Sequence, residues 1–208
     1  MTDLALGIIL SFALTSAVIE ITPGPNMAYL AIVAATEGRR PGYAAVMGVA
    51  LGLATIGVIA ALGLAAAIAA TPLAYQSLRW AGVAYLLWLA WDAWREPVGA
   101  HDLAAPGSSL WRYFQRGLIT NLLNPKAAAF FVTVLPMFVP TGGAVLQPTL
   151  VLTAVYVLVA TLIHLGIVTA AGTARHWLTD PVWERKARRA LALALGLVAL
   201  WFALKTRA

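Results

Sequence analysis

The chain has 208 residues, of which 62% are hydrophobic and only 11% are charged, and it contains no cysteine. Soluble domains carry about 25% charged residues, so this composition is typical of a membrane protein, and the lack of cysteine excludes a thiol enzyme. The formal charge of +6 requires no nucleic-acid partner, because the distribution of the basic residues predicts a membrane topology instead.

Six apolar segments approach the ~20 residues that a helix needs to cross a bilayer. Their approximate bounds are 4–35, 43–69, 78–94, 117–139, 146–171 and 190–204. We therefore expect a single all-α polytopic membrane domain with six transmembrane helices. No cleavable signal peptide is expected, because the N-terminus has no basic residue and Glu20 interrupts the first apolar segment.

The first and fourth segments contain helix-breaking prolines. Thr22-Pro23-Gly24-Pro25-Asn26 lies in the first segment, and Asn124-Pro125-Lys126 lies in the fourth. A proline lacks an N–H and clashes with the preceding turn, so each segment is predicted to form two half-helices. Irregular backbone at membrane depth is tolerated only inside protein or around a water-filled cavity. Pro23, Gly24, Pro25 and Pro125 are therefore predicted to shape a central site.

The lysines and arginines are divided unequally between the connecting segments. Three basic residues fall on one side, namely Arg79, Lys205 and Arg207. Ten fall in the connections between the first and second, third and fourth, and fifth and sixth spans: Arg39, Arg40, Arg95, Arg112, Arg116, Arg175, Arg185, Lys186, Arg188 and Arg189. The positive-inside rule places these ten in the cytoplasm and both termini outside.

The two halves of the chain share one plan. Residues 1–97 and 112–208 each contain three predicted spans, the first of which is broken, and 98–111 form a linker. Because three spans is an odd number, the halves are inserted in opposite senses. Two interrupted segments in corresponding positions predict the inverted repeats of a secondary transporter, with a substrate site near the middle of the membrane.

Three ionisable residues, Glu20, Lys126 and His164, lie inside the predicted spans and away from the span ends where Arg79 and Asp92 stand. A charge at membrane depth costs about 2.5–3.5 kcal/mol on insertion scales, so each is a functional candidate. Glu20, together with His164, is a candidate proton carrier, and Lys126 is a candidate partner for a substrate carboxylate. Two structural alternatives stay open: a fixed Glu20–Lys126 ion pair, and a hydrogen bond from His164 to a backbone carbonyl.

Other polar and small residues have alternative interpretations. Asn26, Asn121 and Asn124 either contact the substrate or satisfy backbone groups freed by the breaks. The half-helix N-termini after Pro25 and Pro125 suit a carboxylate. The spacing of Asp92 and Arg95 predicts a pair on one helix face. Gly48 and Gly52, four residues apart, indicate close helix packing or a homodimer interface.

Five motifs are distributed along the chain: Thr22-Pro-Gly-Pro-Asn-Met27, Arg39-Arg40-Pro-Gly-Tyr43, Gly48-Val-Ala-Leu-Gly52, Leu78-Arg-Trp-Ala-Gly-Val-Ala-Tyr-Leu86 and Gly117-Leu-Ile-Thr-Asn-Leu-Leu-Asn-Pro-Lys126. With these motifs the chain resembles the LysE/RhtB family of bacterial amino-acid exporters. The resemblance covers essentially the whole chain. It implies an efflux carrier of the bacterial cytoplasmic membrane, driven by the proton-motive force. Glu20 departs from the family pattern, which is more often apolar at that position.

The expected function is therefore export of an amino acid or close derivative in exchange for protons. The expected partners are a small zwitterionic substrate, protons and lipid, with no cofactor, metal site or nucleic acid. Efflux of a metal ion or toxic organic compound is the alternative within the same class. A non-transporting scaffold and an intramembrane enzyme are alternatives from other classes, although no nucleophile and base can be identified by spacing.

Overall fold

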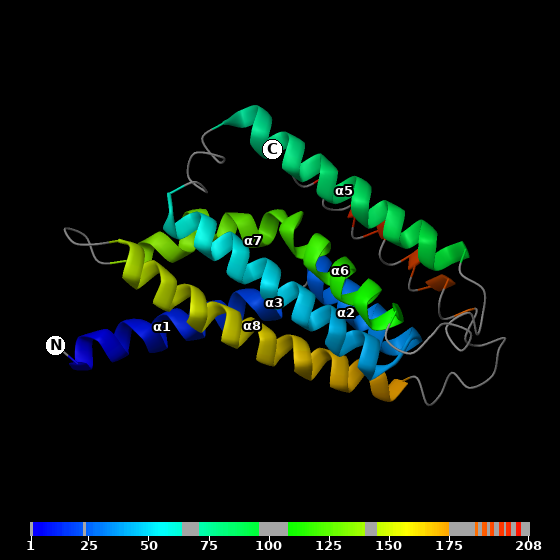
Figure 1. The fold of residues 1–208 in the computed structure, drawn as a ribbon, viewed down its shortest axis with the longest axis horizontal. Coiled ribbons are helices and arrows are strands. Elements are labelled where there is room, and N and C mark those ends of the chain that lie inside the picture. Colours follow the sequence, from blue (N-terminus) through cyan, green and yellow to red (C-terminus); the bar gives the residue numbers. More distant parts are fainter. Residues whose placement is uncertain are drawn as a thin grey trace.

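The computed structural model describes residues 2–22, 24–63, 71–95, 108–139 and 145–174, with single residues and short pairs between 186 and 204. Every regular element in this part of the chain is helical (Figure 1). The α-helices are α1 (Thr2–Ile21), α2 (Pro25–Thr36), α3 (Arg39–Ala61), α5 (Pro72–Arg95), α6 (Ser108–Leu122), α7 (Pro125–Ala129) and α8 (Leu146–Ala174). The predicted helical class is confirmed.

Two of the described helices, α3 and α8, are each long and apolar enough to cross a membrane. Two bent pairs add up to two more spans: α1 and α2 differ in direction by 62°, and α6 and the segment that begins at Pro125 differ by 48°. α5 has 24 residues but is not among these spans, because Gln76, Arg79 and Asp92 lower its hydropathy. The sixth predicted span, 190–204, lies largely outside the described residues. Six spans and two inverted repeats therefore remain predictions.

Both predicted helix breaks are present. Pro23 lies outside the described residues, whereas Gly24 has an extended backbone and caps the N-terminus of α2. Pro25 and Pro125 each begin a helix, where the missing N–H removes no intrahelical hydrogen bond. Because a proline disrupts the turn before it, α1 ends at Ile21 and α6 ends at Leu122.

The fourth predicted segment differs from its expected form at both ends. α6 begins at Ser108, so residues 108–116, which were predicted to belong to a polar connection, are helical. This stretch buries Tyr113 and exposes Trp111, and a search for continuous apolar runs misses such an amphipathic helix. After α7 the chain forms a π-helix (Phe130–Val134) and a 3-10 helix (Leu135–Phe138). Pro136 explains the irregularity, because it has no N–H for a regular α-helix.

α3 and α6 approach each other so closely that their backbones touch. A Cβ atom on Gly48 would lie 2.0 Å from the carbonyl oxygen of Phe114, and a Cβ atom on Gly117 would lie 2.2 Å from that of Ala45. Gly52 faces Asn121, whose Oδ1 would lie 2.6 Å from an added Cβ. The predicted close packing by Gly48 and Gly52 is therefore confirmed, and it occurs within one chain.

An aromatic cluster fills the centre of the bundle between α1, α8 and the π-helix. The ring of Phe130 stacks on that of Tyr156 with centroids 3.9 Å apart, and Phe131 meets the same ring edge-on at 5.3 Å. Phe12 of α1 lies 5.7 Å from Phe130. This packing fixes the position of the Tyr156 side chain, whose hydroxyl belongs to the site described below.

α5 runs along one edge of the bundle in Figure 1 and packs against described residues near the C-terminus. The Arg189 guanidinium lies 5.2 Å from the Trp94 ring, and Gly196 approaches Ala90. On its other side, α5 contacts α6 through an ion pair of 2.5 Å between Asp92 and Arg116. The predicted Asp92–Arg95 pair is therefore wrong: Arg95 instead lies over the ring of Trp91, because the less exposed Arg116 supplies a partner from the next helix.

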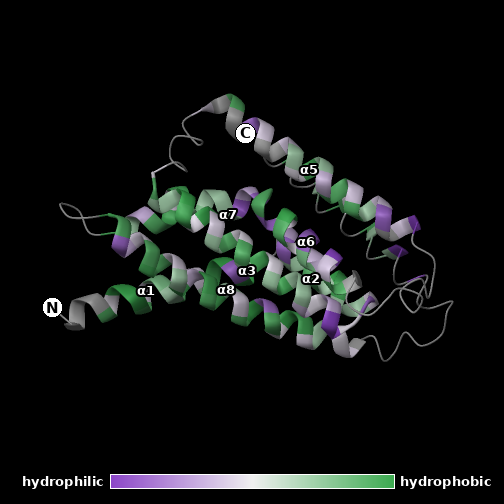
Figure 2. Ribbon diagram, viewed as in Figure 1, coloured by the Kyte–Doolittle hydropathy of each residue, from purple (hydrophilic) through white to green (hydrophobic). Residues whose placement is uncertain are grey.

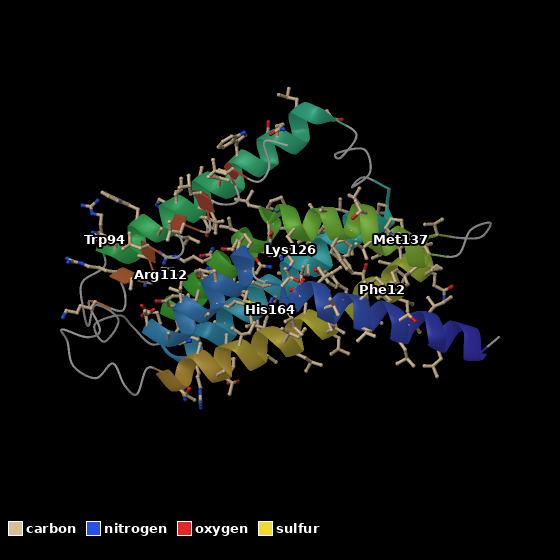
Figure 3. All side chains as sticks on the ribbon, turned by 180° about the vertical axis from the view of Figure 1, so that it is seen from behind. Phe12, Trp94, Arg112, Lys126, Met137 and His164 are labelled. Carbon is tan, nitrogen blue, oxygen red and sulfur yellow. The ribbon has the colours of Figure 1, made fainter. Side chains whose placement is uncertain are left out.

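Basic residues of the predicted cytoplasmic connections gather at one end of the bundle. Arg39, at the start of α3, packs against Gly172 near the end of α8. Trp94 and Arg112 lie together at this end, opposite Met137 (Figure 3). Hydrophilic residues are concentrated there in α5 and α6, whereas α1 begins at the opposite end (Figure 2). This distribution is what the positive-inside interpretation requires, although the side of the membrane remains a prediction.

Candidate functional site

A buried carboxylate lies at the first helix break. Glu20, in the last turn of α1, is only 6% exposed, and its contacts come from α8. The Tyr156 hydroxyl donates a hydrogen bond to Glu20 Oε1, and His164 Nε2 lies 3.3 Å from Glu20 Oε2. Tyr156 and His164 are also buried. The structure therefore brings together two of the predicted residues, Glu20 and His164, and adds a tyrosine to them.

The His164 imidazole contacts the carboxylate without forming an aligned hydrogen bond. Its Nε2 is within ion-pair distance of Glu20, while Nδ1 has no hydrogen-bond partner. The alternative of a hydrogen bond from His164 to a backbone carbonyl is therefore not what the structure shows. The structure therefore places an acid and an imidazole, two side chains that can each bind a proton, in direct contact.

Lys126 connects the second helix break to the first. Its Nζ donates a hydrogen bond of 2.7 Å to the carbonyl oxygen of Thr22, one of the backbone groups freed where α1 ends. The side chain also passes Gly24, where an added Cβ would lie 3.3 Å from Lys126 Cδ. The fixed ion pair with Glu20 is therefore not what joins the breaks: Lys126 binds a carbonyl, and Glu20 contacts Tyr156 and His164.

The three predicted asparagines have different environments. Asn124 caps α7, since its side chain accepts a hydrogen bond of 3.0 Å from the Lys126 N–H, so this residue satisfies a freed backbone group. Asn26 and Asn121 are buried, and Asn26 Oδ1 and both polar side-chain atoms of Asn121 lack a hydrogen-bond partner. A buried polar group without a partner is destabilising by about 1–3 kcal/mol, so these two amides remain candidates for a ligand.

The candidate site lies midway along the bundle. Figure 3 places Lys126 and His164 between Met137 at one end and Arg112 and Trp94 at the other. The residues come from both broken segments and from α8. No group of three or more metal-ligating side chains occurs among the described residues. The arrangement suits proton transfer and the binding of a polar solute within an apolar bundle.

Two residues of the candidate site, Tyr156 and Thr22, were not predicted from the sequence. Tyr156 lies two turns before His164 in an apolar helix, and its spacing from a predicted site histidine was the available signal. Thr22 takes part through its backbone carbonyl, which no side-chain pattern reveals.

Apolar helices that are broken and meet at a buried polar cluster are typical of membrane transporters. The chain belongs to the LysE type translocator family, whose family model matches residues 17–206. It is 31% identical over 188 residues to the homoserine/homoserine lactone efflux protein of Salmonella typhimurium, which covers 89% of each chain. It is 33% identical over 129 residues to the leucine efflux protein of an Enterobacter species, 60% of each chain.

A third relative, the membrane protein YrhP of Bacillus subtilis, is 26% identical and covers 95% of this chain and 97% of its own length. No solved structure matches the chain significantly. The similarity to these two efflux proteins, over 89% and 60% of the chain, supports an exporter in a bacterial membrane.

Proposed function

We propose that the protein exports an amino acid or a close derivative from the cytoplasm in exchange for protons. Relatives named for the efflux of homoserine, homoserine lactone and leucine support the substrate class. The observation that carries the proposal is the Glu20 carboxylate, buried against Tyr156 and His164 where α1 breaks. A titratable pair beside broken helices provides a place for a coupling proton.

The mechanism is alternating access. Before a transported proton binds to Glu20 or His164, the Glu20 carboxylate accepts its hydrogen bond from the Tyr156 hydroxyl. Adding a proton changes the charge of the pair and hence the stability of its contacts between α1 and α8. If those contacts differ between the inward-facing and outward-facing states, proton binding on one side of the membrane and release on the other drive the exchange of substrate for protons.

The substrate carboxylate is proposed to bind between Lys126 and the N-terminus of α2. No side chain caps that terminus, so the amide groups of its first turn remain open to an anion. Lys126 Nζ already lies within reach, because it binds Thr22 two residues before Gly24. Asn26, buried in the same first turn with an unpartnered Oδ1, is the proposed acceptor for the substrate amino group.

We expect Lys126→Gln to raise the KM for amino-acid uptake at least about tenfold, the loss that follows when a hydrogen bond to a charged group is removed. Lys126→Arg, which keeps the positive charge, is the matched control and should lose less. The check is uptake kinetics in proteoliposomes with an amino acid and its methyl ester as inhibitors. If Lys126→Gln discriminates between acid and ester as strongly as the wild type, Lys126 does not bind the carboxylate.

The proposed orientation places both termini outside and the basic end of the bundle in the cytoplasm. It is supported by the common position of Trp94 and Arg112 and by the contact of Arg39 with Gly172. The proposed location is the bacterial inner membrane, and the proposed architecture is two inverted repeats of three spans, each opened by a broken helix.

The experiment that tests the function is uptake of labelled amino acids by proteoliposomes, with and without an imposed pH gradient. Saturable uptake of one class of amino acid, stimulated by the gradient, is the expected result. Uptake whose rate does not depend on the pH gradient would contradict the proton exchange but would still support a carrier of amino acids. No uptake of any amino acid by folded protein would direct attention to metal ions and toxic organic compounds, and then to a scaffold.

A further inference from the structure

A second polar cluster lies at the basic end of the bundle, between α5 and α6. Arg116 forms the 2.5 Å ion pair with Asp92, and its guanidinium also lies 5.4 Å from the ring of Trp88. The Arg116 side chain is 14% exposed and that of Asp92 is 35% exposed. The Asp92–Arg116 ion pair is therefore partly shielded from solvent. Glu20, His164 and Lys126 take no part in it.

A buried tyrosine from a third helix lies within the electrostatic range of the same arginine. Tyr29 of α2 is 3% exposed, and its hydroxyl has no hydrogen-bond partner. Among the charged side chains that act on that hydroxyl, Arg116 has the strongest electrostatic effect, and Arg112 has a weaker effect of the same sign. A buried O–H donor without an acceptor, in the positive potential of two guanidinium groups, is an arrangement that suits an anion.

We propose that Arg116 binds the carboxylate of an incoming amino acid, and that Asp92 occupies this place in the state described here. The inference rests on the proposed function, which supplies an amino-acid carboxylate arriving at the basic end. The substrate carboxylate replaces that of Asp92 on Arg116, and Tyr29 donates a further hydrogen bond to it. Arginine favours two-pronged binding of one carboxylate, so substrate and Asp92 compete for the same guanidinium.

Replacement of the Asp92 carboxylate by that of the substrate changes the contacts that hold α5 against α6. Asp92–Arg116 is a polar contact between α5 and α6 at the basic end, whereas Gly82 packs against the Leu123 carbonyl farther along α5. On its other face α5 packs against the described C-terminal residues, through Arg189 and Gly196. When the substrate takes Arg116, α5 loses its ion pair to α6, and the basic end of the bundle opens.

Kinetics distinguish this role from that of a purely structural ion pair. In proteoliposome uptake, Asp92→Asn removes the internal competitor and is expected to lower the KM several-fold, whereas Arg116→Gln raises it at least about tenfold. Arg95→Gln removes a charge from the same end of α5 and is the matched control, with an unchanged KM. A structural pair predicts the same direction of change for both members, and that result would overturn the proposal.

A distance measurement provides the second test. Because the chain contains no cysteine, spin labels can be attached at Leu87→Cys in α5 and Ile119→Cys in α6, two exposed positions. The distance between the labels is measured by electron paramagnetic resonance. We expect it to increase when a mixture of L-amino acids is added, and not when the corresponding amides are added. In Asp92→Asn the longer distance should be present without any ligand.

The outcomes separate this proposal from the proposed function. Normal amino-acid uptake with an unchanged label distance in Asp92→Asn would overturn the role of the ion pair and leave the exporter intact. A longer distance in Asp92→Asn, combined with no response of the wild-type pair to amino acids and no uptake, would overturn the carboxylate ligand together with the proposed function. If Arg116→Gln does not fold, Arg116→Lys replaces it, since it keeps the charge and loses the two-pronged contact.

Discussion

Glu20→Gln is expected to abolish the stimulation of uptake by a pH gradient while leaving the folded protein at a normal level. The amide cannot take up the transported proton, yet it has the size of the carboxylate and can still accept the hydrogen bond from Tyr156. Uptake along the substrate's own concentration gradient should persist. The measurement is initial uptake into proteoliposomes across a series of imposed pH gradients.

The matched control for this experiment is Glu37→Gln. Glu37 is also buried, but it caps the far end of α2, away from the helix break. Its substitution should leave the gradient response unchanged. A Glu20→Gln protein that responds to the gradient like the wild type would show that the coupling proton binds elsewhere, and His164→Gln would then be the next variant.

Gly48→Ala is expected to destabilise the fold more than a single added methyl group usually does. The new Cβ would lie 2.0 Å from the Phe114 carbonyl oxygen, which is backbone and cannot move without separating α3 from α6. Overpacking of this kind destabilises by about 1–3 kcal/mol, and a backbone clash belongs at the upper end. Thermal unfolding of detergent-solubilised protein, followed by tryptophan fluorescence, measures the change.

Gly166→Ala supplies the control in a helix of the same bundle. An added Cβ there meets nothing within 4 Å, so alanine should be neutral or stabilise α8 by up to about 1 kcal/mol through its helix propensity. Equal loss of stability in the two variants would mean that general helix properties, and not the α3–α6 contact, determine the response at Gly48.

The helix breaks could be predicted because their cause is local. Pro25 and Pro125 alter the backbone wherever they stand, and α2 and α7 begin at these residues. Gly48 and Gly52 were also informative, since small residues four apart permit close packing. The start of α6 was missed because its first turns are amphipathic, and apolar runs reveal only helices that are hydrophobic on every side.

The contacts of the site could not be read from the sequence, because they join residues far apart along the chain. Glu20 and Tyr156 are separated by 136 positions, and Lys126 and Thr22 by 104. Charge alone suggested Lys126 as the partner of Glu20 and Arg95 as the partner of Asp92. In the structure each acid instead contacts side chains of another helix, Glu20 those of α8 and Asp92 that of Arg116 in α6. Tertiary packing decides which of these groups meet.

The glycine contacts between α3 and α6 also constrain which parts of the protein can move. α3 belongs to the first half of the sequence and α6 to the second, yet their backbones interlock at Gly48 and Gly117 with no side chain between them. Such a contact has no room for sliding or tilting, so the two helices form one mechanical body. In the proposed alternating-access mechanism, the boundary between stationary and moving parts would therefore cut across the two halves of the sequence and would not follow the linker between them.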